Sequence, residues 1–480
     1  MLFNSIEFAV FLPIVFFLYW FVFNRNLKLQ NFFVVVVSYV FYGWWDWRFL
    51  FLIAFTSFCS WYSGLLIERY KDEHRKAKTI SILNIVLNLL ILGVFKYYDF
   101  FVTSFANLFL GGKTDGLLLK IILPVGISFY TFQALSYSID VYRGKMEPTK
   151  DIIQFFAFVS FFPQLVAGPI ERATNLLPQF AKPRRFDYDD AVDGMRQMLW
   201  GLFKKMVVAD NCAFYVNQVF SDYSSYSGST LLLAAVFFTF QIYCDFSGYS
   251  DIAIGVAKLF GIRLMRNFNV PYFSRDIAEF WRRWHISLTT WFRDYVYIPL
   301  GGSRVSSAKV IRNTFVIFLL SGLWHGANWT FIVWGAYHAL LFLPLILTGK
   351  NRKYTNQVAE GRSLPSLKEM CQMSITFMLV VIGWILFRAD SIEQAWGYLL
   401  GIFNKSLFTA PWLHLRSYYL PVLLSILVLL IVEWVQRGKE HAFDLRGIKS
   451  HVLKYFIYLL VVIALFWLGG QAETFIYFQF

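Results

Sequence analysis

The sequence has 480 residues, of which 58% are hydrophobic, 20% are aromatic and only 15% are charged. Soluble globular domains carry about 25% charged residues, so this composition excludes a soluble protein and predicts an all-α, polytopic integral membrane protein. The formal net charge of +14 does not predict a nucleic-acid partner, because the basic residues cluster between apolar runs, as they do in cytoplasmic loops. The four cysteines have neither CxxC nor Cys/His spacing, so we expect neither a disulfide framework nor a zinc site.

Three apolar runs at the N-terminus, residues 7–24, 30–45 and 49–67, predict three membrane spans joined by short turns. The loops at 69–78 and 143–150 are rich in lysine and arginine, which predicts that both are cytoplasmic. The N-terminus is therefore predicted to lie on the outer side of the membrane. No basic region precedes the first run, so we expect that run to remain in the mature protein rather than to be cleaved as a signal peptide.

Further apolar runs at 79–95, 98–110 and 117–141 predict spans, with a break near Lys96. The run at 152–167 is short, contains a proline and has basic residues on both sides. It is consistent with either a re-entrant hairpin or a short tilted span.

The remaining long apolar runs predict spans that place the C-terminus on the outer side of the membrane, like the N-terminus. No repeat, low-complexity stretch or long hydrophilic region interrupts them, so we expect one integral-membrane domain over residues 1–480. These runs are residues 192–220, 230–260, 370–388, 418–436 and 453–469.

Residues 241–304 combine carboxylates, arginines and aromatic residues in an otherwise apolar region. Asp245 and Asp251 are either structural anchors or site residues, since buried carboxylates must be paired or protonated, and we favour anchors. Between Lys258 and Arg312 there are ten Lys or Arg against three Asp or Glu, which predicts a stretch at the cytoplasmic interface.

Residues 279–290 (EFWRRWHISLTT) read as one helix with His285 on its apolar stripe. His285 is either a site residue or an interfacial histidine without chemistry. Arg282 and Arg283 would suit an anionic, phosphate-bearing substrate, because arginine binds phosphate in a bidentate manner. The same two arginines would equally suit lipid headgroups.

His325 lies between two apolar runs, thirteen residues after Arg312. If the intervening residues are helical, it lies about 20 Å into a hydrocarbon layer about 30 Å thick. An ionisable group at that depth is a functional candidate, and the alternative is a histidine that hydrogen-bonds helices together. The neighbouring Gly322, Gly326 and Asn328 predict irregular or tightly packed backbone.

Four stretches together resemble the membrane-bound O-acyltransferase (MBOAT) family, and within it the bacterial branch that contains the alginate O-acetylation protein AlgI. The likeness covers essentially the whole chain. The stretches are SFFPQLVAGPI (160–170), CDFSGYSDIA (244–253), NFNVPYFSRDIAEFWRRWHISLTTWFRDYVYIPLGG (267–302) and LSGLWHGANWTFIVWGAYH (320–338).

The resemblance implies a fold of about 11–12 membrane helices, some re-entrant, around a central funnel. It implies that His325 and His285 form the catalytic site, with acetyl-CoA as a cytoplasmic acyl donor and no tightly bound cofactor or metal. It also implies a polysaccharide acceptor at the cell surface or outside the cell, reached directly or through a periplasmic SGNH-type acetyltransferase partner.

The residues permit acyl transfer, in which His325 accepts a proton from an acceptor hydroxyl or assists release of a thiol. Trp324 and Asn328 are candidate lining residues. A carrier-protein donor, as in D-alanyl transfer, remains an alternative substrate. A non-enzymatic transporter or flippase that uses the two histidines as a proton relay is an alternative of another class.

Overall fold

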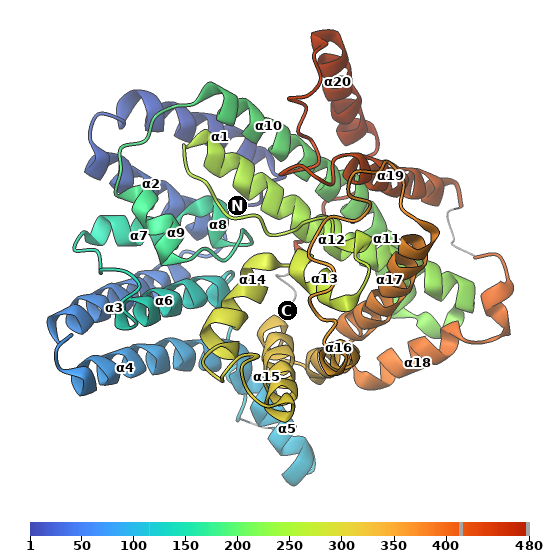
Figure 1. Cartoon of the computed structure of the whole chain (residues 1–480), viewed down its shortest axis with the longest axis horizontal. Coiled ribbons are helices and arrows are strands. Elements are labelled where there is room, and N and C mark those ends of the chain that lie inside the picture. Colours follow the sequence, from blue (N-terminus) through green and yellow to red (C-terminus); the bar gives the residue numbers. More distant parts are fainter. Residues whose placement is uncertain (115, 412–415, 477–480) are drawn as a thin grey trace. The chain divides into compact units, whose positions relative to one another are not determined.

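The computed structural model describes residues 1–114, 116–411 and 416–476, and in these ranges every regular element is helical (Figure 1). The predicted all-α class is thereby confirmed. The chain forms two compact units: Met1–Met195 with Ala253–Met265, and Arg196–Ile252 with Arg266–Phe480. The prediction of one domain over 1–480 is not tested by this division and stays a prediction.

Helices α10 (Tyr188–Leu202) and α12 (Gly228–Leu259) each continue from one unit into the other. The other helices of the first unit are α1 Ile6–Phe17, α2 Leu27–Gly43, α3 Phe49–Arg69, α4 His74–Leu92, α5 Tyr98–Phe109, α6 Ile127–Tyr142, α7 Ile152–Ser160, α8 Phe162–Leu165 and α9 Ala173–Phe180.

The second unit holds the residues singled out as candidate site residues. Its remaining helices are α11 Asp210–Ser221, α13 Ile277–Arg283, α14 Ile286–Phe292, α15 Ser307–His325, α16 Trp329–Leu347, α17 Leu367–Arg388, α18 Ile392–Ile402, α19 Arg416–Val435 and α20 His451–Trp467.

Five helices in the described chain are long and apolar enough to cross a membrane, and four shorter apolar helices accompany them. The expectation of a multi-pass membrane protein is confirmed. The count of 11–12 membrane helices and the central funnel stay predictions. The five long helices are Phe49–Arg69, His74–Phe109, Gly228–Leu259, Trp329–Leu347 and Leu367–Arg388.

Two of the predicted segments differ from the structure. The predicted break near Lys96 is wrong, because Gly93–Tyr97 forms a π-helical turn that keeps His74–Phe109 one continuous helix. A π-turn accommodates a local mismatch without ending the helix. Of the run predicted at 117–141, residues 117–126 are not helical, and helix α6 begins only at Ile127.

The short run at 152–167 is divided into α7 and α8 at Phe161, whose ψ of 108° is not helical and which directly precedes the first turn of α8 with its proline. The choice between a re-entrant hairpin and a tilted span stays open.

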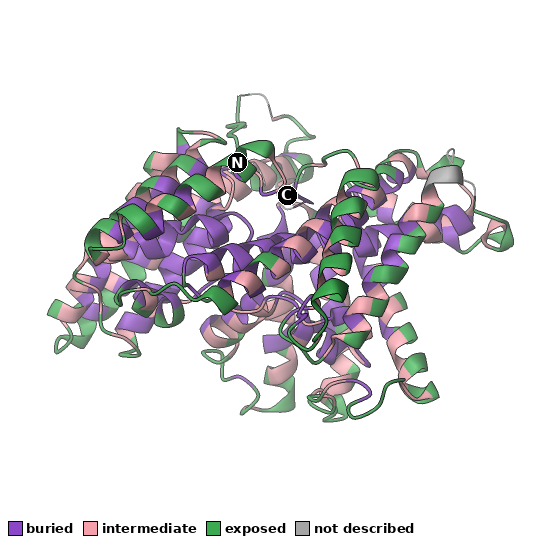
Figure 2. Ribbon diagram, turned by 90° about the horizontal axis from the view of Figure 1, so that it is seen from above, coloured by how far each residue is buried: buried purple, intermediate pink, exposed green. Residues whose placement is uncertain are grey.

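Burial separates core helices from lipid-facing ones (Figure 2). In α12, 83% of the most apolar part of the helix is buried, although its sequence is long and apolar enough to cross a membrane. In α20, no residue is buried, and Phe466 and Trp467 are 87% and 83% exposed. Large exposed apolar side chains are favourable in contact with lipid and unfavourable in contact with water. Their exposure on α20 therefore supports the membrane assignment.

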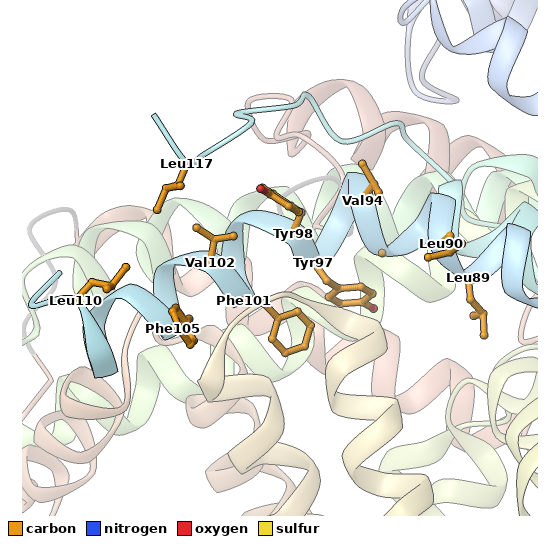
Figure 3. A pocket seen from close by; sticks show the side chains of 11 residues that line it. Leu89, Leu90, Val94, Tyr97, Tyr98, Phe101, Val102, Phe105, Leu110 and Leu117 are labelled. Atoms are coloured by element: carbon orange, nitrogen blue, oxygen red, sulfur yellow. The ribbon is translucent and has the colours of Figure 1, made fainter. Parts of the chain in front are cut away.

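A wide apolar groove of about 740 Å³ follows the long helix of the first unit (Figure 3). Leu89, Val94, Phe101 and Phe105 are among its lining residues, and the lining is almost entirely apolar. Such a surface suits lipid chains.

The two carboxylates of α12 are anchors, as the sequence indicated. Asp251 pairs with Lys204 at 2.5 Å, and Asp245 pairs with Lys205 at 2.8 Å. Lys205 also pairs with Asp210 at 2.8 Å. These buried charges are paired, because an isolated charge in such surroundings would be far more costly.

Helices α15 and α16 form a tight antiparallel hairpin whose connection follows His325. Two glycines allow the close approach: a Cβ atom on Gly322 would lie 2.2 Å from the Phe331 carbonyl oxygen, and one on Gly335 would lie 2.3 Å from the Phe318 carbonyl oxygen. Tight packing was predicted around Gly322, and the structure confirms it.

The Gly322→Ala variant is expected to unfold at a lower temperature than the wild type. Its added methyl group would meet backbone rather than a movable side chain, so the hairpin would have to separate, at a loss of about 1–3 kcal/mol or more. Thermal unfolding in detergent measures the effect. Gly93→Ala is the matched control, since nothing lies within 4 Å of its Cβ position, and equal stability of the two variants would contradict the prediction.

Candidate active site

His325 is the last residue of α15, so the run from Arg312 to His325 is helical, as its predicted depth required. Its side chain is 3% exposed and lies among aromatic rings. The ring centroids of Trp324, Trp334 and Phe387 are 5.0, 5.2 and 5.3 Å from that of His325. These contacts fix the imidazole in one position at the end of the hairpin.

His285 is 1% exposed and lies at the junction of two short helices. The prediction of one continuous helix over 279–290 is wrong, because α13 ends at Arg283 and α14 begins at Ile286. His285 itself has φ 43° and ψ 55°, a left-handed conformation that costs an L-residue about 1–3 kcal/mol and occurs most often at functional sites.

An extended segment holds this junction in place. The Ile286 amide donates to the Asn267 carbonyl at 2.9 Å, and the Asn269 amide donates to the Arg283 carbonyl at 2.9 Å. Backbone hydrogen bonds on both sides of His285 therefore impose its strained conformation.

The side chain of Asn267 fixes the tautomer of His285. The Ser287 amide donates to Asn267 Oδ1 at 3.3 Å, and a backbone N–H can only donate, so this atom is the carbonyl oxygen. His285 Nδ1 lies 3.1 Å from the same oxygen and must carry a hydrogen to bond to it. The lone pair of the neutral ring is then on Nε2, which is the nitrogen available for acid–base chemistry.

The two imidazoles are brought together, with ring centroids 6.4 Å apart. Trp324 contacts both, at 5.8 Å from His285 and 5.0 Å from His325. At this separation, a substrate atom between the rings is within reach of both. The structure therefore brings the two histidines close together, and their catalytic role, implied by the resemblance, stays a prediction.

Replacement of Asn267 by alanine is expected to lower the rate of the acyl transfer that the resemblance implies about 10- to 100-fold while the protein still folds. The variant leaves the His285 ring without its orienting acceptor, a loss of about 1–3 kcal/mol at the site. Initial rates in membranes of matched expression measure the effect. Asn175→Ala, in the first unit, is the control, and an Asn267→Ala rate equal to that of this control would contradict the prediction.

A cavity of about 210 Å³ lies along α15, and neither His285 nor His325 is among its lining residues. Its lining includes Thr314, Phe318 and Ser321, and Ser321 is one helical turn before His325. The lining also includes Arg293 and Arg352, both exposed. The cavity is therefore lined by apolar side chains together with cationic ones.

The two arginines proposed as substrate ligands are in different surroundings. Arg282 lines the cavity and donates to the carbonyls of Asn351 and Tyr354, at 2.8 and 2.7 Å. Arg283 is 7% exposed and pairs with Glu279 at 2.8 Å. The geometry therefore favours Arg282 as a ligand and gives Arg283 a structural partner.

Asn328 caps α16: its Oδ1 accepts from the Thr330 amide at 3.1 Å, and its Nδ2 donates to the Asp390 carbonyl at 2.9 Å. This side chain fixes the turn after His325. Trp324, by contrast, touches both histidines, as a lining residue would.

Sequence reasoning did not single out Asn267, Ser287 or Phe246. Phe246 lies 4.7 Å from His285, ring to ring, and the C-terminal Phe475 packs on Phe246 at 6.1 Å. Asn267 is the first residue of the stretch 267–302 that carries the family resemblance, but no local sequence pattern pairs it with His285, 18 positions away. Among the described residues, no group of three or more His, Cys, Asp or Glu side chains could hold a metal ion.

Comparison with known proteins gives consistent matches. Residues 148–387 match the model of the membrane-bound O-acyltransferase family. The chain is 43% identical to a probable alginate O-acetylase AlgI of Pseudomonas aeruginosa, over 84% of this chain and 75% of that protein. It is 31% identical to the peptidoglycan O-acetyltransferase of Helicobacter pylori, over 100% of this chain and 98% of that protein. A teichoic acid D-alanyltransferase of Bacillus subtilis is 30% identical over 56% of this chain and 70% of that protein.

Proposed function

Because this chain belongs to the membrane-bound O-acyltransferase family, we propose that it transfers an acetyl group from cytoplasmic acetyl-CoA across the membrane for O-acetylation of a polysaccharide. The observation that carries this proposal is the buried histidine pair, whose ring centroids are 6.4 Å apart, beside a cavity lined by three arginines and by Ser321, one helical turn before His325. That arrangement suits a long donor with an anionic head and a reactive thioester at its far end.

The arginines that line the cavity account for the phosphate groups of the donor. Arg282, Arg293 and Arg352 line one cavity, and three guanidinium groups offer bidentate contacts to phosphate. Arg293 is partly neutralised by Asp294, at 2.6 Å. We therefore assign Arg282 and Arg352 the larger part of donor binding, and we assign Arg283 none.

The distance along α15 from Thr314, a lining residue of the cavity, to His325 suits a thioester arm. Thr314 and His325 are eleven residues apart on α15, which is about 16 Å of helix. A donor whose phosphates are bound by the arginines would place its thioester near His325.

The chemistry is nucleophilic acyl substitution. A hydroxyl oxygen bonds to the thioester carbonyl carbon, the carbon–sulfur bond breaks, and the hydroxyl proton passes through an imidazole to the leaving thiolate. We assign His325 the proton transfer, while His285, held by Asn267, orients the reacting groups or exchanges the same proton through Nε2.

The acceptor is proposed from the relatives, whose names denote acetylation of alginate or of peptidoglycan. We propose a cell-surface or secreted polysaccharide, reached directly or through a periplasmic SGNH-type partner. The protein would then lie in the inner membrane with both termini in the periplasm.

The test is thioester consumption by the purified protein in lipid nanodiscs. With acetyl-CoA labelled in the acetyl group, we expect release of CoA and appearance of label on the acceptor or on the protein. A D-alanyl carrier protein is offered in parallel, because one relative is a D-alanyltransferase. If only the D-alanyl carrier protein is consumed, the donor is that carrier and not acetyl-CoA. If neither thioester is consumed, the result favours a transporter.

A further inference from the structure

A third histidine, His338 on α16, is completely buried and 0% exposed. Neither of its ring nitrogens has a hydrogen-bond partner among the residues that the structure describes. A buried polar group without a partner costs about 1–3 kcal/mol, and an apolar ring of the same shape would avoid that loss. An imidazole at this position therefore needs an explanation other than packing.

The surroundings of His338 form an aromatic box. The ring centroids of Trp281 and Trp334 are each 5.0 Å from that of His338, and Phe318 is at 6.3 Å. Nε2 faces α17 at Gly383, where an added Cβ atom would lie 2.8 Å from it. The box connects two parts of the site, since Trp281 and Phe318 line the cavity and Trp334 contacts His325.

Along α16, His338 lies between a residue that lines the cavity and a residue that contacts His325. Phe342 lines the cavity, His338 is one helical turn from it, and Trp334, which contacts His325, is one turn further. The eight residues from Phe342 to Trp334 span about 12 Å. A donor arm that runs from the cavity to His325 must therefore pass the level of His338.

Resting on the function proposed above, we propose that His338 recognises the amide-bearing arm of the thioester donor, by a hydrogen bond to an amide group of that arm once the Trp281 indole has turned aside. One imidazole nitrogen donates and the other accepts, so the ring can pair with either the N–H or the carbonyl of an amide. The pantetheine arm of acetyl-CoA carries two amides. His338 is thus a specificity residue for donors of this class, and binding gives a hydrogen-bond partner to one of its two ring nitrogens.

The experiment compares two donors on the full-length protein in nanodiscs, with thiol release as the readout. Acetyl-pantetheine has the amide-bearing arm without the nucleotide, and S-ethyl thioacetate has neither amide nor nucleotide. Because a site built to pair with a polar group discriminates strongly against a ligand that lacks it, we expect the wild type to prefer acetyl-pantetheine.

In His338→Phe, we expect kcat/KM for acetyl-pantetheine to fall about 10- to 100-fold, while the rate with S-ethyl thioacetate changes less than about twofold. The melting temperature should stay the same or rise, because the phenyl ring fills the box without unpaired nitrogens. His338→Gln keeps a donor and an acceptor and should retain part of the preference, which provides a second variant if the first does not fold. His451→Phe, at an exposed position, is the control.

Equal losses with both donors, or no loss with either, would overturn the role of His338 while leaving acyl transfer intact. A wild type that releases thiol from neither donor nor from acetyl-CoA would overturn the proposed function, and this inference with it.

Discussion

The His325→Ala variant is expected to release thiol from acetyl-CoA roughly 10²- to 10⁴-fold more slowly than the wild type, which is the usual contribution of a positioned general acid or base. The imidazole lies at the end of α15, between Trp324 and Trp334 and opposite His285, where alanine offers no proton acceptor. Both kcat and kcat/KM should fall, because the lost interaction is made in the transition state.

Folding must be separated from chemistry in this test. Alanine leaves a small void among the aromatic rings, so the melting temperature should fall as well. His325→Gln fills more of the space and still offers hydrogen-bonding groups, and we expect it to be nearly as inactive while closer to the wild type in stability. A glutamine variant with most of the wild-type rate would show that His325 has a packing role only.

The sequence anticipates much of this fold because long apolar runs have few solutions in a membrane. The runs at 7–24, 30–45 and 49–67 correspond to helices that begin and end within a few residues of the predicted bounds. Gly322 and Gly326 indicated tight backbone around His325, and the hairpin has that geometry. Helical periodicity and glycine placement are local signals, and a linear reading captures them.

Features that depend on contacts between distant segments could not be predicted from the sequence. The break at His285 depends on backbone bonds from the segment 267–269, and the regular apolar stripe of residues 279–290 gives no sign of it. Asn267 becomes an orienting residue only through that same pairing. His338 is the last residue of the stretch 320–338 that carries the family resemblance. The aromatic rings around it, however, come from α13, α15 and α16.

Changes at His285 can separate backbone conformation from imidazole chemistry. His285→Asn keeps a residue type that tolerates the left-handed region, whereas His285→Ala adds the strain of a residue that does not. We expect both variants to lose roughly 10²-fold or more in thiol release, and only alanine to lose additional stability, by about 1 kcal/mol.

The comparison with Asn267→Ala completes the assignment, because that change leaves the imidazole present but no longer oriented. If His285 acts through Nε2 while Nδ1 is held by Asn267, the Asn267→Ala and His285→Asn changes remove parts of one unit, and the double variant should be little slower than His285→Asn alone. Initial rates of the four proteins at matched expression measure this coupling. Fully multiplicative losses would mean that the two side chains act independently, and that the tautomer set by Asn267 has no part in the reaction.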